Sequence, residues 1–406
     1  MKKVLFVAYH FPPLAGGGTF RSLKFVKYLP EFGWLPTVLT TNTKNYLAYD
    51  KTLLNEVPEN VKIIRAGEYD PFYLHILLSK IGLEKLYQKI KDRFLIPDEK
   101  IGWIPLAYRK AVRELKKYKY DLIFSTSPTP CAHIIALKLR KKFGIPWICD
   151  FRDFWTDHPY YRFINTHRGN HEIALEKKII STAELIITAF NKIRLSWRYT
   201  YQEINDNKFY TIYNGYDSQI YNVKENKNKK LNLLYTGSFY GKYNPRVFFD
   251  VLLSVYKTNQ NFRKHVSIKL IGNIDPEIRN QTVENVEYLP YTSPTRLNEY
   301  IENSDVLLLV LPVESGLPGK IFTYMATLKP IFAIVPDGET KEILKKTKLA
   351  YLADPDSVTE ITNQLLNIYT LWKANKLNPR ANTDYIQQFQ RRNQVKQLSK
   401  IFNRIV

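Results

Sequence analysis

The chain has 406 residues, of which 45% are hydrophobic and 24% charged, and its formal net charge is +22. This composition is ordinary for a globular protein, and the length suffices for two domains. No run of about 18 apolar residues occurs, so no membrane-spanning helix is expected. The two cysteines, Cys131 and Cys149, exclude a disulfide framework or a cysteine-based metal cluster. Residues 4–8 are too short an apolar run for a secretory signal, which predicts a cytoplasmic protein.

The excess of positive charge predicts an anionic partner, although a lysine-rich composition from an AT-rich genome is an alternative explanation. The charge is uneven, because residues 84–119 contain eleven Lys or Arg and five Asp or Glu. Apolar residues run through this stretch or just ahead of it: Leu77, Ile81, Leu86, Ile90, Phe94 and Leu95. Such a pattern is typical of a basic amphipathic helix on an anionic bilayer, and equally of a solvated helix packed on its own domain.

The first predicted element is a buried parallel strand at residues 4–8, which the prolines and glycines of residues 12–18 end. A helix is predicted from about Thr19 to Leu29. The glycine-rich turn lets a ligand approach the backbone, and the helix N-terminus offers free N–H groups to an anion. This arrangement indicates a nucleotide-handling α/β domain. The triplet Gly16, Gly17 and Gly18 departs from the Gly-x-Gly-x-x-Gly fingerprint, so NAD binding is not predicted.

Strands and helices alternate along the rest of the first half. Further strands are predicted at residues 38–41, 61–65, 120–126, 145–150, 185–189 and 210–213. Helices are predicted at residues 132–142 and around Glu172 and Glu176. The polar, lysine-rich residues 222–230 are typical of a linker.

The second half repeats the pattern. Strands are predicted at residues 231–237, 266–271, 286–289, 305–311 and 330–335, and helices at 245–256, 294–303 and 384–406. Two runs of this kind predict two doubly wound Rossmann-like α/β domains, residues 1–217 and 218–384, followed by a helix at 385–406. Ligands of such domains bind at the carboxyl ends of the strands, in the cleft between the halves.

Seven short motifs occur in an order and spacing that resemble one known family. They lie at residues 11–18 with Arg21, 96–98 with 102–103, 125–128, 150–156, 214–217, 235–240 and 316–330. Over nearly its whole length the chain resembles the retaining glycosyltransferases of family four, which have the GT-B fold. The resemblance implies a nucleotide-diphosphate-sugar donor, UDP- or GDP-linked, held mainly by the C-terminal half, and an acceptor held mainly by the N-terminal half. It also implies that no metal ion or other cofactor is bound and that the last helix returns to the N-terminal domain.

A diphosphate in a dry cleft needs cationic donors and backbone N–H groups. Lys242 and Arg246 follow Gly237, about where similar enzymes place their diphosphate cations. Lys320 and Gly319 lie where a loop opens a helix, and Gly16, Gly17 and Gly18 are expected at the same phosphates from the other domain. A solvated surface position is the alternative for any single lysine here.

One departure from the family concerns two glutamates, eight positions apart, near the ribose and the donor sugar. Their positions are taken here by Thr323 and Ser315. Glu314 is one residue away and is expected to substitute in part. The Thr323 hydroxyl is expected to contact the ribose without the strength of a carboxylate.

Acceptor activation is assigned to the segment after the strand at residues 145–150. Asp150 or Asp153 is expected to orient or deprotonate the acceptor hydroxyl, and Arg152 to bind a phosphate. An internal Asp–Arg ion pair that fixes the loop is the alternative. His10 is a further candidate for contact with the sugar. The resemblance implies that the departing phosphate helps to deprotonate the acceptor, which agrees with the absence of a Ser-His-Asp or Cys-His signature.

These features predict a cytoplasmic glycosyltransferase, peripheral on the inner face of the plasma membrane, that builds a capsule, O-antigen or exopolysaccharide. Its expected partners are a nucleotide-sugar donor, a lipid-linked or glycan acceptor and an anionic membrane surface. Two alternatives stay open. One is a nucleotide-sugar 2-epimerase of the same fold, and the other is a non-enzymatic binder of polyanions. No nucleic-acid-binding module is recognised, so nucleic acid is not an expected partner.

Overall fold

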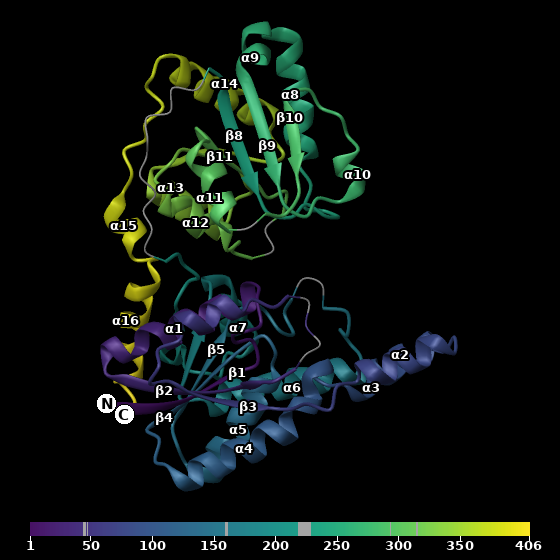
Figure 1. Ribbon diagram of the computed structural model, residues 1–406, viewed down its shortest axis with the longest axis vertical. Coiled ribbons are helices and arrows are strands. Elements are labelled where there is room, and N and C mark those ends of the chain that lie inside the picture. The colour runs from purple at the N-terminus through teal and green to yellow at the C-terminus, as the bar shows by residue number, and fades with distance from the viewer. Residues whose placement is uncertain (44–45, 47, 159–160, 218–228, 293, 314–315) are drawn as a thin grey trace. The chain divides into compact units, whose positions relative to one another are not determined.

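The computed structural model describes residues 1–43, 46, 48–158, 161–217, 229–292, 294–313 and 316–406. The chain divides into two compact units (Figure 1). The first unit comprises Met1–Asn214 with Arg391–Val406, and the second comprises Gly215–Gln390.

The first unit is built on a seven-stranded parallel sheet. Its strands, in spatial order, are β3 (Lys62–Ala66), β2 (Trp34–Thr41), β1 (Lys2–Ala8), β4 (Leu122–Thr126), β5 (Trp147–Phe151), β6 (Leu185–Thr188) and β7 (Phe209–Thr211). In the central register, Val4 lies opposite Pro36 of β2 and Leu122 of β4. Residues 4–8 are fully buried because helices cover both faces of the sheet.

Helices lie on both faces of this sheet (Figure 1). They are α1 (Gly17–Tyr28), α2 (Phe72–Lys80), α3 (Glu84–Phe94), α4 (Trp103–Lys117), α5 (Cys131–Phe143), α6 (His167–Thr182), α7 (Asn191–Thr200) and α16 (Arg391–Phe402), with 3₁₀ turns at Leu29–Phe32, Lys51–Glu56, Glu99–Gly102 and Asp206–Lys208. Alternate residues of β1 share one core with α1 and with the last helix, α16. Val395, Leu398 and Phe402 of α16 are fully buried there, so the C-terminal helix packs in the first unit.

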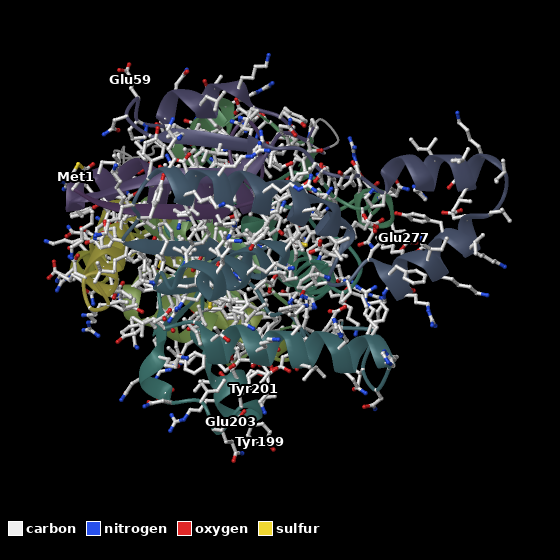
Figure 2. The ribbon with its side chains drawn as sticks, turned by 90° about the horizontal axis from the view of Figure 1, so that it is seen from below. Met1, Glu59, Tyr199, Tyr201, Glu203 and Glu277 are labelled. Carbon is white, nitrogen blue, oxygen red and sulfur yellow. The ribbon has the colours of Figure 1, made fainter. Side chains whose placement is uncertain are left out.

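Helices α2 and α3 form an antiparallel hairpin around Ile81–Leu83 that projects beyond the body of its own unit (Figure 1, Figure 2). The sequence predicted a basic amphipathic stretch at residues 84–119. The structure divides that stretch into α3, a 3₁₀ turn and α4.

The second unit has a six-stranded parallel sheet. Its strands, in spatial order, are β10 (Val286–Leu289), β9 (Val266–Ile271), β8 (Leu231–Thr236), β11 (Val306–Val310), β12 (Ile331–Ile334) and β13 (Ala350–Ala353). Its helices are α8 (Arg246–Thr258), α9 (Gln260–His265), α10 (Pro276–Arg279), α11 (Pro294–Glu302), α12 (Lys320–Ala326), α13 (Glu339–Thr347), α14 (Val358–Lys373) and α15 (Thr383–Gln387). The core combines the sheet with α8 and α14.

The expectation of one continuous helix at residues 384–406 was wrong. Two helices, α15 and α16, occupy this region, and Gln388–Gln390 separates them. The chain changes units at this interruption. Tyr216 pairs with Gln390 in an isolated bridge, which holds the two ends of the second unit side by side.

None of the helices in the described residues combines the length and apolar character needed to cross a bilayer.

Candidate functional site

Each sheet changes direction of winding at its centre. The strand order reverses between β1 and β4 in the first unit and between β8 and β11 in the second. In open α/β sheets, ligands bind outside the carboxyl ends of the strands at such a point. The predicted site residues follow these strands: His10 and the glycines follow β1, Gly237 follows β8, and Lys320 follows β11.

In the second unit, the structure brings Gly237 and Lys320 together. A Cβ at Gly237 would lie 2.7 Å from Lys320 Nζ, and Gly237 has a φ of +131°, which side-chain-bearing residues rarely adopt. Gly272 closes the same turn, because a Cβ there would lie 2.0 Å from the Gly237 carbonyl oxygen. The backbone of Gly237, which has no side chain, therefore faces Lys320 at the carboxyl ends of the strands.

Lys320 extends across the face of Tyr235. Its Nζ donates a hydrogen bond to Tyr235 Oη at 2.7 Å and lies 3.9 Å from the ring centroid. Tyr235 Oη in turn donates to the Ser238 carbonyl at 3.0 Å. Burial lowers the pKa of Lys320 to about 7. No carboxylate of the described residues forms an ion pair with this ammonium group, and Glu314 and Ser315 lie outside those residues.

Helix α12 holds Lys320 in place through Tyr324. The buried Tyr324 hydroxyl accepts a hydrogen bond from the Thr236 N–H at 2.9 Å and donates to the Leu308 carbonyl at 3.4 Å. These contacts connect α12 to β8 and β11, the two strands at the centre of the sheet.

The other residues predicted for the donor lie less deeply. Thr323 is one turn along α12 from Lys320 and is partly buried, while Gly319 caps the helix N-terminus and is exposed. Lys242 and Arg246 are exposed on the loop and helix after Gly237. No hydrogen bond or ion pair in the described residues connects either of them to Lys320.

In the first unit, the glycine turn contacts the residue after β5. Arg152 donates hydrogen bonds to the Gly17 and Gly18 carbonyls. Burial, reinforced by the charge of Arg21, lowers the pKa of Arg152 to about 10. The N–H groups of Gly17 and Gly18 have no acceptor among the described residues, as is usual in the first turn of a helix. Gly16 enters this turn with a φ of +109°.

His10 lies against the same turn. A Cβ at Gly18 would lie 3.0 Å from the His10 ring, which explains the glycine. His10 Nδ1 donates to the Pro128 carbonyl at 2.7 Å, so the neutral ring presents Nε2 as an acceptor. Burial lowers the pKa of His10 to about 4, which keeps the imidazole neutral at physiological pH.

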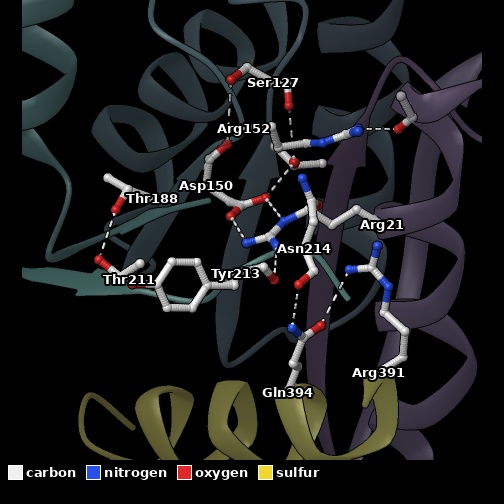
Figure 3. A network of polar contacts seen from close by, with 12 residues as sticks. Arg21, Ser127, Asp150, Arg152, Thr188, Thr211, Tyr213, Asn214, Arg391 and Gln394 are labelled. Carbon is white, nitrogen blue, oxygen red and sulfur yellow. Dashed lines mark hydrogen bonds and ion pairs between the residues drawn. The ribbon is translucent and has the colours of Figure 1, made fainter. Parts of the chain in front are cut away.

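Asp150 is fully buried and forms an ion pair with Arg21 (Figure 3). Arg21 Nη2 and Nε contact the two carboxylate oxygens at 2.7 and 3.0 Å, and Thr126 donates to one of them at 2.7 Å. Arg21 also donates to the Tyr213 carbonyl at 2.9 Å. With both oxygens engaged and no exposed surface, Asp150 positions the loop and does not reach a substrate. This is the internal Asp–Arg pair that the sequence left open, formed with Arg21 rather than Arg152.

Asp153 lines a pocket of about 340 Å³ that opens beside the ends of β4 and β5. Its walls combine the aromatic rings of Phe151, Phe154, Trp155, Tyr161 and Phe163 with the carboxyl groups of Asp98, Asp153 and Glu172 and the basic groups of His158, Arg162 and Arg168. Desolvation raises the pKa of both Asp98 and Asp153. Aromatic faces beside carboxylates suit a ligand that has C–H surfaces and hydroxyl groups, as a sugar does.

The sequence did not single out Arg168, and it quoted Tyr235, Glu172, Arg21 and Asp98 in motifs or predicted elements without a role in the site. Glu172 accepts from Arg168 Nε at 2.6 Å and from Trp155 Nε1 at 3.0 Å, so it supports the pocket wall. Among the described residues, no group of three or more His, Cys, Asp and Glu side chains could hold a metal ion.

Family models match both halves of the chain. The model "Glycosyltransferase Family 4" matches residues 15–220, and "Glycosyl transferases group 1" matches residues 230–370. No match was found among curated proteins.

Solved structures share the fold at low identity. Anabaena HepE, solved in complex with UDP and glucose, is 13% identical with a TM-score of 0.66, and 100% of each chain is covered. Sucrose-phosphate synthase from Thermosynechococcus elongatus is 15% identical with a TM-score of 0.66, covering 100% of this chain and 99% of that one. The lipopolysaccharide outer core galactosyltransferase WaaB is 15% identical with a TM-score of 0.59, covering 99% of both chains. The predicted GT-B fold, with two Rossmann-like domains, is confirmed.

Proposed function

This chain belongs to glycosyltransferase family 4, and on that premise we propose that it transfers a sugar, with retention, from a nucleotide-diphosphate sugar to an acceptor hydroxyl. In the reaction, the bond between the sugar C1 and the diphosphate oxygen breaks and a bond to the acceptor oxygen forms. The acceptor proton passes to the departing phosphate.

The observation that carries the proposal is the contact between Gly237 and Lys320, at the point where the strand order of the second sheet reverses. A partly buried ammonium group beside bare backbone suits the two negative charges of a diphosphate, whose oxygens accept charge-assisted hydrogen bonds. The complexes of HepE with UDP and with UDP-glucose favour a uridine donor. We assign the diphosphate to Lys320 and the ribose to Thr323, with Lys242 and Arg246 at the periphery. These side-chain cations take the charge-neutralising role that a metal ion has in other transferases.

The pocket of the first unit is assigned to the acceptor. Asp153 reaches it and is proposed to orient the acceptor hydroxyl. His10, neutral and with Nε2 available, is proposed to accept a hydrogen bond from a sugar hydroxyl. Arg152 and the free N–H groups of Gly17 and Gly18, at the N-terminus of α1, are proposed to bind a phosphate.

The acceptor is proposed to be a lipid-linked or growing glycan of the cell envelope, elongated at the inner face of the plasma membrane. WaaB, a lipopolysaccharide outer core galactosyltransferase with the same fold, is the match that supports this assignment. The positive charge of the chain supports attraction to an anionic membrane.

A thermal-shift panel of UDP-, GDP-, ADP- and CMP-sugars tests the donor class, because a ligand that binds only the native state raises the melting temperature. A shift with a UDP- or GDP-sugar is expected. Incubation with that donor alone, followed by NMR of the sugar, separates transfer from 2-epimerisation. An epimerised nucleotide sugar without acceptor would replace the proposal by the epimerase.

A further inference from the structure

The tip of the α2–α3 hairpin exposes a cluster of aliphatic side chains. Leu77 and Ile81 are 59% and 60% exposed, and Leu83 and Leu86 are 43% and 44% exposed. All four lie within about one helical turn of the connecting residues. The hairpin projects from its unit, and its side chains extend into open space (Figure 2). Exposed apolar clusters at one place on a surface mark interaction sites.

The hairpin is also cationic. Residues 72–94 contain five Lys or Arg and two Asp or Glu. Both acidic residues already face basic groups, since Glu84 lies 3.9 Å from His75 and Asp92 lies 3.2 Å from Arg162. In the described part of the chain, Lys80, Lys85, Lys89 and Arg93 form no ion pair.

We propose that this hairpin docks the protein on an anionic lipid bilayer. Its aliphatic tip enters the boundary between headgroups and acyl chains, and its lysines meet the lipid phosphates. An apolar surface bordered by Lys and Arg is the composition that binds anionic membrane surfaces.

The combination of charge and apolar side chains favours a bilayer over other possible partners of this surface. A second copy packed hairpin against hairpin would bring two cationic surfaces together, and like charges repel. A nucleic acid would match the lysines but would leave the aliphatic tip in water. A bilayer with anionic headgroups satisfies the cations and the aliphatic groups together.

The base of the hairpin borders the proposed acceptor pocket. Arg168, in the pocket wall, donates to the Lys91 carbonyl at 3.2 Å and to the Pro97 carbonyl at 2.9 Å. Arg162, also in the wall, pairs with Asp92 of α3. Docking would therefore place the pocket beside the lipid surface, within reach of an acceptor whose lipid stays in the membrane. This last link rests on the proposed function, whereas docking itself is measured without substrate.

Co-sedimentation of the full chain with vesicles tests the inference. We expect binding to vesicles of phosphatidylglycerol and phosphatidylcholine that weakens with added salt, and little binding to phosphatidylcholine alone. Leu77→Glu/Ile81→Glu and Lys80→Glu/Lys85→Glu should each weaken binding at least about tenfold. The control, Leu253→Glu/Lys257→Glu, changes one aliphatic and one basic residue on the exposed side of α8 and should bind as the wild type does.

Equal binding to both vesicle types, or hairpin variants that bind like the wild type, would overturn the inference. A wild-type dimer that Leu77→Glu/Ile81→Glu dissociates would assign the tip to a second copy instead. Titration of UDP without vesicles should give the same affinity in both hairpin variants as in the wild type. If neither UDP nor GDP binds while vesicle docking persists, the proposed function fails and the docking surface stands.

Discussion

Lys320 connects the sequence to the chemistry most directly. Its ammonium group lies between Tyr235 and the bare backbone of Gly237, and burial lowers its pKa to about 7. The protonated form of a lysine in such a place is unfavourable in free energy while no anion is bound, because desolvation disfavours the charged form. A diphosphate bound here would restore the charged form, so we expect ligand binding and protonation to be coupled.

This coupling predicts proton uptake when UDP binds above pH 7. Free Lys320 loses its proton as pH rises through about 7, while the bound lysine keeps it, so affinity should fall as pH rises above 7 and level off below it. Calorimetric titration at pH 8 in two buffers of different ionisation enthalpy measures the uptake. Lys320→Met should abolish it, and Lys257→Met on α8 should leave it unchanged.

Gly237 should not tolerate substitution by alanine, for two separable reasons. Alanine there is strained by the φ of +131° and also meets Lys320 Nζ, whereas alanine at Gly241, with a φ of +52°, has open space around it. Both variants should lose about 1–3 kcal/mol of unfolding free energy from backbone strain. Only Gly237→Ala should also lose affinity for UDP. Equal affinities in the two variants would contradict a ligand at this turn.

Asp153→Asn should reduce sugar transfer by about 10–10²-fold without a change in UDP affinity, because the carboxylate is proposed to orient the acceptor hydroxyl through a charge-assisted hydrogen bond. Asp356→Asn, at an exposed position of the second unit, is the control. Initial rates at saturating donor and a UDP titration measure the two effects. A parallel loss of UDP affinity would place Asp153 in the donor site.

At the scale of elements, the ends of several strands are held by polar contacts that the sequence order conceals. Arg21 of α1 connects the ends of β5 and β7 through Asp150 and Tyr213. Gln394 of α16 donates to the Asn214 carbonyl at 2.9 Å, so the last helix fixes the same region (Figure 3). The loops that carry His10 and Arg152 extend from this framework.

The buried ion pair of Arg21 and Asp150 predicts that substitutions of the two residues have non-additive effects on the free energy of unfolding. Arg21→Met should lower the free energy of unfolding by about 3–5 kcal/mol, because it leaves the Asp150 carboxylate buried and uncompensated. Adding Asp150→Leu should recover most of that loss. Denaturant unfolding of the single and double variants measures the coupling. Additive losses would mean that the two charges do not stabilise each other.

Long apolar runs made most of the sheets predictable. Residues 4–8 and 306–310 are fully buried strands, as their sequences indicated. The strand β13 was missed because it is a short edge strand in which only Ala353 is buried, so it lacks a strong pattern.

The predicted site was incomplete because its contacts join distant parts of the chain. Tyr235 and Lys320 are 85 positions apart, and Arg152 meets Gly17 across 135 positions. The loop and helix around Lys320 singled it out in the sequence, but its partner depends on how β8 and β11 pair. The roles of Asp150 and Arg21 likewise follow from burial, which one sequence does not reveal.

At the scale of the whole molecule, each unit supplies one half of the proposed reaction. The second unit contains Lys320 and the glycine backbone proposed for the nucleotide diphosphate, and the first contains the pocket with Asp153 proposed for the acceptor. The basic hairpin is the proposed docking site for the lipid surface. The proposed donor site, acceptor pocket and docking hairpin lie on different elements, so substitutions should inactivate each of them separately.

The central claim is that Lys320 binds the diphosphate of the donor, and a calorimetric titration of UDP and GDP into the wild type and Lys320→Met tests it most directly. We predict saturable binding of at least one of the two by the wild type, and an affinity about tenfold to a hundredfold lower in the variant, as expected for a lost charge-assisted hydrogen bond. Equal affinities in the two proteins, or no binding of either nucleotide by the wild type, would contradict the account.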